Sequence, residues 1–144
     1  MEYLITQKLK EIDFKINSDK SDIKIVEDIL SEINHYSELE QEKVVNLQIA
    51  LSEALLNAIV HGNKENREKF VYINIIYEKK YICIEVRDEG KGFDLNSLPN
   101  PTDDENLYKE HGRGIFIMKS LVDEFKCSAS DKGTKYTLIV KQDK

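Results

Sequence analysis

Five short segments of the chain have the pattern of β-strands. The predicted strands cover residues 12–16, 71–76, 81–86, 125–129 and 135–140. In the first two, apolar and polar residues alternate, as they do when one face of a strand is buried and the other is exposed. Residues 78–80 form a predicted tight turn, so the second and third strands should make an antiparallel hairpin.

Three stretches outside the strands are predicted to be helices. The first follows the capping residues Asn17-Ser18-Asp19 and runs to Asn34. Its apolar residues recur on one face, and they are Ile23, Val26, Ile29, Leu30 and Ile33. The last helix is predicted at residues 114–122. Helices on one face of a mixed, mostly antiparallel sheet predict a two-layer α/β sandwich of the α+β class.

The second predicted helix is the most apolar element. Ser37 and Glu40 have the spacing of a capping box, and the helix should run to about Val60. Gly62 suits the residue after a helix end. Because nearly every residue from 49 to 60 is apolar, this helix should be largely buried.

Two polar residues interrupt that apolar helix on one face. Glu53 and Asn57 are one turn apart, and His61 continues their face. Burying a carboxylate is costly unless it is paired or bound, so either a ligand pocket or a strip open to solvent must meet these side chains. Oxygen ligands suit Mg²⁺, which bridges substrate phosphates. Asn57 is therefore a candidate Mg²⁺ ligand, and Glu53 is a candidate base or water-orienting residue.

A first glycine cluster follows the third predicted strand. Asp88 closes that strand, and Gly90 and Gly92 come directly after it. Glycines allow the backbone to turn sharply or to approach a flat ligand. The Asp88 carboxylate could accept a hydrogen bond from an amino group such as that of adenine. The alternative is an ordinary turn at the end of a strand.

A second cluster precedes the last predicted helix. Gly112, Arg113 and Gly114 would place free backbone N–H groups and the positive helix end where a phosphate could bind, with a guanidinium beside them. The alternative is a flexible helix entry, since the chain has neither a P-loop nor a dinucleotide fingerprint. Gly133-Thr134 indicates only a turn followed by a strand.

Composition and charge narrow the function classes. The chain has 144 residues, the usual size of one domain, and a net charge of −6 without a basic block, so nucleic acid is not an expected partner. The N-terminus lacks the pattern of a signal peptide, and no segment approaches the length needed to cross a bilayer, so we expect a cytoplasmic protein without membrane contact. Cys83 and Cys127 are expected to be reduced thiols.

Taken in order, these motifs resemble the GHKL ATPase superfamily of gyrases, heat-shock chaperones, histidine kinases and mismatch-repair proteins. The nearest resemblance is to its anti-sigma-factor serine-protein-kinase branch. Residues 51–63 resemble the N box of that branch, residues 88–94 its first glycine box, and residues 112–125 its second. The resemblance extends from about residue 10 to the end of the chain.

The resemblance implies a Bergerat-type ATP-binding fold in one histidine-kinase-like ATPase domain. That domain would cover residues 1–144, with an N-terminal extension at residues 1–9 and an ATP lid at residues 94–111, within the one long polar loop of the chain. Asp88 would bind the adenine amino group, with Thr134 assisting through water.

The remaining roles implied by the resemblance concern the phosphates. Asn57 would bind Mg²⁺, and Glu53 would be the general base. The segment Gly112-Arg113-Gly114 would lie under the phosphates, and Gly90 and Gly92 belong to the same nucleotide-binding set.

The implied function is that of an ATP-dependent serine/threonine protein kinase. It would phosphorylate a small antagonist protein in a partner-switching pathway, and it would bind a sigma factor in the alternative partner state. A homodimer is expected from the resemblance only. One alternative is an ATP-dependent regulator that binds a partner with little catalysis, and another is an α+β domain without a nucleotide site. A sensor histidine kinase is not expected, because nothing before Ile12 supplies a helical hairpin with a phospho-accepting histidine.

Overall fold

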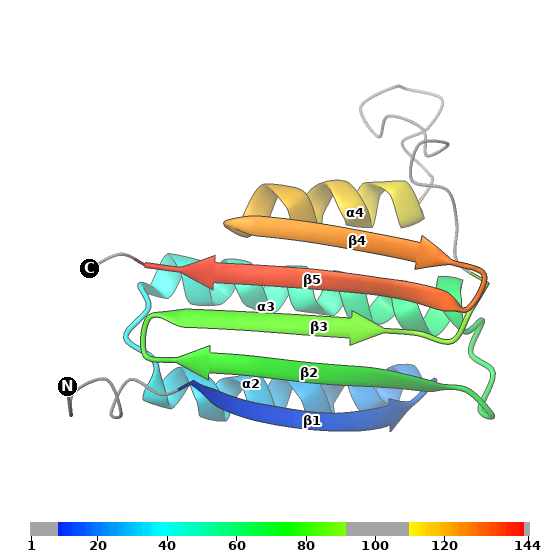
Figure 1. The fold of residues 1–144 in the computed structure, drawn as a ribbon, viewed down its shortest axis with the longest axis horizontal. Helices are drawn as coiled ribbons and strands as arrows, with labels where there is room; N and C mark the ends of the chain where they lie inside the picture. Colours follow the sequence, from blue (N-terminus) through cyan, green and yellow to red (C-terminus); the bar gives the residue numbers. More distant parts are fainter. Residues whose placement is uncertain (1–8, 92–109, 143–144) are drawn as a thin grey trace.

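The computed structural model describes residues 9–91 and 110–142, and side chains from residue 113 onward in the second range. Five strands form one sheet in the order β1-β2-β3-β5-β4 (Figure 1). The strands are β1 (Lys10–Asn17), β2 (Phe70–Glu78), β3 (Tyr81–Arg87), β4 (Glu124–Ser130) and β5 (Gly133–Lys141). Every neighbouring pair is antiparallel, so the sheet is wholly antiparallel over the described residues, where a mixed sheet was predicted.

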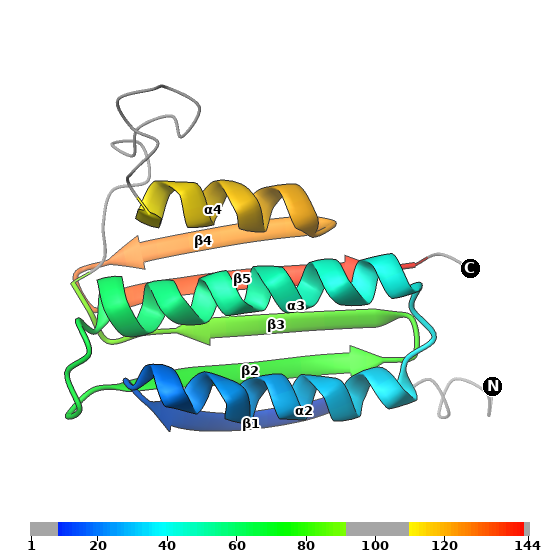
Figure 2. The ribbon, with the colours of Figure 1, turned by 180° about the vertical axis from the view of Figure 1, so that it is seen from behind.

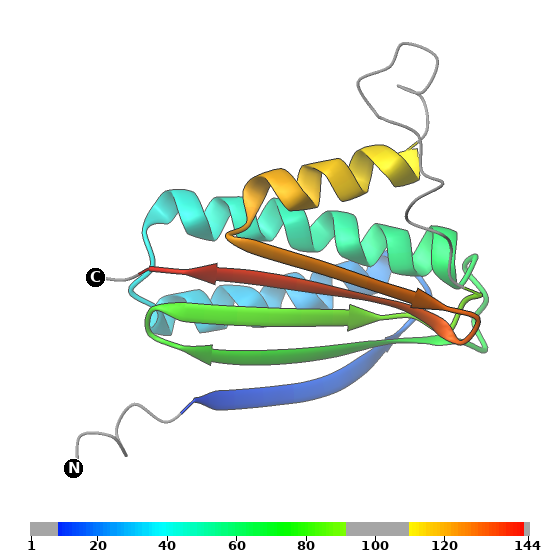
Figure 3. The ribbon, with the colours of Figure 1, turned by 45° about the horizontal axis from the view of Figure 1, so that its top comes forward.

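The helices all lie on one face of this sheet. They are η1 (Lys20–Asp22), α2 (Ile23–Tyr36), α3 (Gln41–Leu56), η2 (Asn57–Gly62) and α4 (Glu110–Leu121). The central helix α3 lies between α2 and α4 when the molecule is seen from behind (Figure 2). The tilted view shows the helices as one layer and the sheet as the other (Figure 3). The predicted two-layer α+β sandwich is therefore confirmed.

The core fills the space between the two layers. Alternate residues of β2, namely Val71, Ile73 and Ile75, have no exposed surface, as the alternation predicts. Leu51 and Leu55 of α3 belong to the same buried cluster. Complete burial of each such side chain contributes about 1.5–3 kcal/mol to folding, which explains why an apolar α3 is held in the middle of the layer.

The central helical segment tests the prediction that no part of the chain is long and apolar enough to cross a membrane. Residues Gln41–Gly62 are long and apolar enough to cross a membrane, with a mean hydropathy of 1.3, so the prediction that no segment was long enough is wrong. Half of that segment is buried inside the fold. The core helix of a folded protein has the same composition, and packing against the sheet accounts for it here.

The start of α3 differs from the prediction. The capping box of Ser37 and Glu40 does not form, because α3 begins at Gln41 and Glu40 makes no side-chain cap hydrogen bond. The N–H of Glu38 donates to the Lys79 carbonyl at 2.6 Å, and the N–H of Glu40 donates to a side-chain oxygen of Gln142 at 2.8 Å. These contacts hold the connecting segment extended, and Ser37 instead ends α2.

The last helix also begins earlier than predicted. It starts at Glu110, so Gly112, Arg113 and Gly114 lie within the helix and not ahead of it. The four N–H groups without a partner inside a helix begin one residue before the first helical residue, so that of Gly112 is the last of these four and that of Arg113 already has a partner. That of Gly114 comes after these four.

Candidate functional site

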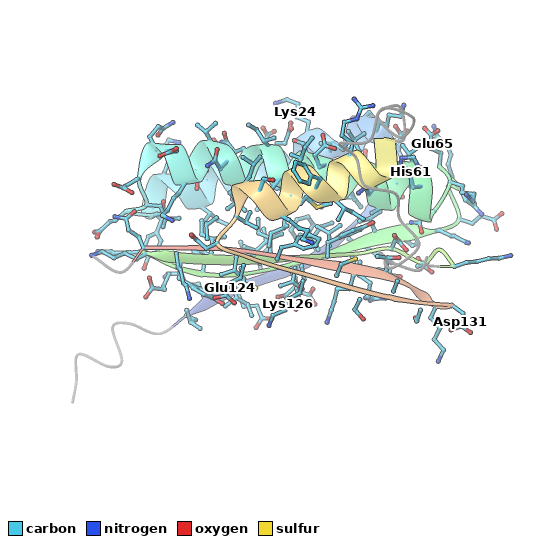
Figure 4. The ribbon with its side chains drawn as sticks, turned by 90° about the horizontal axis from the view of Figure 1, so that it is seen from above. Lys24, His61, Glu65, Glu124, Lys126 and Asp131 are labelled. Atoms are coloured by element: carbon cyan, nitrogen blue, oxygen red, sulfur yellow. The ribbon has the colours of Figure 1, made fainter. Side chains whose placement is uncertain are left out.

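A cavity of about 430 Å³ opens between the C-terminal half of α3, η2 and α4. It is lined by Lys20, Glu53, Leu56, Asn57, Val60, His61, Arg113, Gly114 and Ile117. The view from above shows His61 at the end of η2, close to the start of α4 (Figure 4). The cavity therefore brings together four predicted site residues, from two motifs that lie far apart in the chain, and they are Glu53, Asn57, Arg113 and Gly114.

The helical wall of this cavity carries the predicted acid and amide. Glu53 is half-buried, whereas Asn57 is 3% exposed and its Nδ2 atom has no hydrogen-bond partner. Asn57 opens η2, a π-helical turn that continues α3, and such turns are frequent at functional sites. A buried amide group with an unpaired donor costs free energy, so the site suits a polar ligand.

Gly114 lets α4 approach this wall. A Cβ atom at Gly114 would stand 2.9 Å from Oε1 of Glu53 and 3.4 Å from the amide atoms of Asn57. The absence of a side chain at Gly114 thus leaves room for the side chains of Glu53 and Asn57. Its flexibility is not required there, because the residue lies inside a helix.

Asp88 occupies a separate, buried position at the end of β3 and is 1% exposed. Its Oδ1 atom accepts hydrogen bonds from the N–H groups of Gly90 (2.9 Å) and Thr134 (3.0 Å). Its Oδ2 atom is buried and has no partner. Removal from water raises the pKa of Asp88, and the two backbone hydrogen bonds oppose that shift. The arrangement fixes one carboxylate oxygen and leaves the other for a donor from a ligand.

Three glycines allow the close packing around Asp88. A Cβ atom at Gly62 would stand 2.0 Å from Asp88 Oδ2, and one at Gly133 would stand 2.2 Å from the Asp88 carbonyl oxygen. A Cβ atom at Gly90 would stand 2.1 Å from the Gly62 carbonyl oxygen. Gly62 was predicted to be the residue after the helix, but it is the last residue of η2. It must be glycine because a carboxylate lies against it.

The two parts of the site meet through Tyr136, a residue that the sequence reading did not single out. Tyr136 is 1% exposed, and its side chain makes a hydrogen bond with Asn57. Burial raises the pKa of Tyr136, and the neighbouring Cys127 and Asp88 raise it further. Burial and Asp88 also raise the pKa of Cys127 to about 11. The only signal in the sequence was a tyrosine at an inward position of a predicted strand.

Asn63 is a second residue whose role the motifs alone did not reveal. It is 1% exposed, and its Nδ2 atom donates to Ser18 Oγ (2.8 Å) and to the Phe70 carbonyl (3.0 Å). Its Oδ1 atom accepts from the N–H of Glu89 at 2.7 Å. One buried amide therefore ties the end of η2 to β2, to the end of β1 and to the Asp88 loop.

The structure thus places most of the predicted site residues around one region. Glu53, Asn57, Arg113 and Gly114 line the cavity, and Asp88, Gly90 and Thr134 form a hydrogen-bonded group next to Gly62. Gly112 lies in the first turn of α4. Gly92 and nearly all of the predicted lid at residues 94–111 lie outside the described residues.

Two glycine-to-alanine variants should separate the fold from the site. Gly90→Ala places its methyl group against backbone, which cannot move aside, so we expect a loss of about 1–3 kcal/mol in the free energy of unfolding. Gly114→Ala meets the end of a flexible Glu53 side chain, and alanine favours a helix by up to about 1 kcal/mol. We expect this variant to keep its stability. Urea unfolding of both variants checks this, and equal destabilisation would contradict it.

Comparisons with known proteins identify related sequences and folds. A family model of the histidine kinase-like ATPase domain matches residues 16–140. Anti-sigma F factors of Bacillus cytotoxicus and Bacillus cereus are 37% identical over 86 residues, and the match covers 58% of this chain and 58% of each relative. The chain thus spans less than two thirds of the length of these relatives.

Solved structures share the fold at low identity. The crystal structure of the RsbU and RsbW domains of a Mycobacterium tuberculosis protein has a TM-score of 0.66 at 16% identity, covering 92% of this chain and 32% of that one. The histidine kinase domain of a blue-light activated kinase from Erythrobacter litoralis has a TM-score of 0.51 at 14% identity, covering 88% and 61%. With the family match over most of its length, the chain belongs to the histidine kinase-like ATPase domain family, within the GHKL superfamily that its motifs resemble.

Proposed function

We propose that this chain binds Mg-ATP and transfers the terminal phosphate to a serine or threonine of a small antagonist protein. The observation that carries the proposal is the unpartnered Oδ2 atom of the buried Asp88. An unsatisfied buried acceptor costs about 1–3 kcal/mol, and the exocyclic amine of adenine is a donor that would satisfy it. Gly62 packs against the Asp88 carboxylate and Gly90 packs against the Gly62 carbonyl, at positions where a side chain would collide.

The cavity beside α4 fits the phosphates. Arg113 lies on its wall with a guanidinium suited to phosphate oxygens, and the first turn of α4 presents N–H groups without helical partners. The buried side chain of Asn57 offers an amide oxygen of the kind that Mg²⁺ accepts. Bound there, Mg²⁺ would neutralise charge on the phosphates.

Glu53 is proposed as the general base. Its carboxylate lines the same cavity as Arg113 and lies within one turn of Asn57. During transfer the hydroxyl oxygen of the substrate forms the new bond to phosphorus, ADP leaves, and the hydroxyl proton passes to Glu53. A water molecule in place of the hydroxyl would give simple ATP hydrolysis.

The similarity to anti-sigma F factors supports a regulatory role. We propose that the chain acts in the cytoplasm as a homodimer, alternating between an antagonist protein and a sigma factor. The proposed unit is a single domain, and the ATP lid at residues 94–111 remains part of that proposal.

Two measurements on the full chain test the function. Calorimetry with Mg-ADP should detect saturable binding to one site per chain. Radiolabelled ATP should then transfer label to a serine or threonine of the small antagonist protein encoded nearest to this chain. Binding without transfer would favour the alternative of an ATP-dependent binding regulator, and absence of binding would overturn both functions.

A further inference from the structure

Lys20 is a positively charged residue at the cavity to which the proposed function assigns no role. Lys20 lies in η1, between β1 and α2, yet it lines the same cavity as Arg113 of α4. The two residues come from opposite sides of α3, since α2 and α4 flank that helix (Figure 2). The cavity is therefore approached by a positive side chain from each side.

The turn beneath Lys20 is held in place by its neighbours. Oδ1 of Asp19 accepts hydrogen bonds from the N–H and the hydroxyl of Ser21, both at 2.9 Å. Oδ2 of Asp19 accepts from Arg67 at 3.0 Å, and Oδ2 of Asp22 accepts from the N–H of Asn17 at 3.1 Å. This network fixes the backbone of η1, so the Lys20 side chain starts from a defined position at the cavity wall.

The charge of Lys20 is not used within the described part of the chain. Its ammonium makes no ion pair or hydrogen bond there, whereas Lys24 pairs with Asp28 at 3.1 Å and Lys43 pairs with Asp123 at 3.0 Å. The cavity walls carry Lys20 and Arg113 against one carboxylate, that of Glu53. In a chain of net charge −6, this local positive excess favours an anionic ligand.

The geometry points to Lys20 as a residue that binds the terminal phosphate of the nucleotide and thereby favours the triphosphate over the diphosphate. This inference rests on the proposed function. Asp88 does not line the cavity of Lys20, and Asn57 connects the two regions through Tyr136. A nucleotide with its base at Asp88 would pass Asn57 before its phosphates reach the wall where Lys20 lies. A diphosphate is one phosphate shorter and would leave Lys20 without a contact.

The test measures binding of two nucleotides to four forms of the full chain. The forms are the wild type, Lys20→Met, Lys20→Arg and the matched control Lys24→Met. Lys24 lies on the side of α2 away from the sheet (Figure 4), and its side chain is 78% exposed. Calorimetry is done with a non-hydrolysable ATP analogue and with ADP, both in the presence of Mg²⁺.

Lys20→Met should weaken binding of the triphosphate about tenfold, the usual effect of losing one charge-assisted hydrogen bond, and binding of ADP less than about twofold. Lys20→Arg should keep the preference for the triphosphate, and Lys24→Met should change neither affinity. Since Lys20 is exposed, thermal melts of all four forms should coincide.

Other outcomes overturn the inference in distinguishable ways. If the wild type binds neither nucleotide, the proposed function fails together with the role of Lys20. If the wild type binds both and Lys20→Met weakens both equally or neither, only the role of Lys20 fails. Unchanged nucleotide affinities with reduced label transfer to the antagonist protein would also refute the phosphate contact and would place Lys20 on the side of the protein partner.

Discussion

Replacing Asp88 with Asn should reduce the affinity for Mg-ATP and Mg-ADP at least about a hundredfold. The variant loses a buried charge-assisted hydrogen bond, and it places one hydrogen-bond donor against another. Oδ1 could still accept from Gly90 and Thr134, because asparagine retains one acceptor. The unpartnered Oδ2 would become an NH₂ group that faces the amine of adenine. Calorimetry with Mg-ADP measures the loss, and Asp13→Asn on the exposed side of β1 is the matched control.

The same variant should not lose stability at neutral pH. Desolvation raises the pKa of Asp88, so the folded state binds a proton there more tightly than the unfolded state does. By linkage, ionisation of this group destabilises the fold as the pH rises from the unfolded pKa through the folded pKa. Asparagine carries no such cost. Urea unfolding at pH 7 should give Asp88→Asn at least the stability of the wild type, and marked destabilisation would mean that the affinity loss reflects misfolding.

Replacing Glu53 with Gln should lower phosphoryl transfer to the antagonist by about 10²–10⁴-fold, the usual contribution of a general base. Glutamine has nearly the same shape and keeps the hydrogen-bonding capacity toward the cavity, but it cannot take the hydroxyl proton. Nucleotide affinity should remain within about threefold of the wild type, since no adenine contact is lost. Label transfer and calorimetry on the same preparation measure the two effects.

The matched control is Glu42→Gln, an exposed carboxylate in the first turn of the same helix. It changes the net charge by the same amount and should leave transfer unaltered. If Glu53→Gln transfers label at the normal rate, Glu53 is not the base. If it abolishes nucleotide binding, its role is structural. Partner binding that survives Glu53→Gln but requires Asp88 would favour the alternative of a binding regulator.

Residue patterns predicted those features of the fold that depend on local order. The alternation of Val71, Ile73 and Ile75 placed β2 on the core, and the period of Val26, Leu30 and Ile33 placed the buried face of α2. Both signals are reliable because burial of every second residue of a strand, or of every third to fourth residue of a helix, requires apolar residues at those positions of the sequence. The fold class followed from the same record, since helices and strands with one apolar face must pack in layers.

Helix boundaries were less predictable because distant segments set them. Ser37 has the chemistry of an N-cap, but the turn after β2 and the residue Gln142 already bond the backbone of Glu38 and Glu40. The start of α4 at Glu110 was likewise not visible in a stretch rich in glycine and charge. A capping motif depends only on residues close together in the chain. At the start of α3, hydrogen bonds from distant residues to the backbone of Glu38 and Glu40 replaced the predicted cap.

The candidate site also has features that the local sequence predicts and features that only contacts between distant segments determine. The chain order of Glu53, Asn57, Asp88, Gly114 and Thr134 was enough to name the residue types that a nucleotide site needs, because each carries its chemistry in its own side chain or in the lack of one. Which of them meet, and what else joins them, depended on the packing of α3 against α4 and β5. Tyr136 lies beside Asn57, Gly62 lies against Asp88, and Lys20 lines the same cavity as Arg113, although these residues belong to segments far apart in the chain. Such proximity leaves no periodic trace in a sequence, since it arises only when the apolar faces of separate elements are buried together.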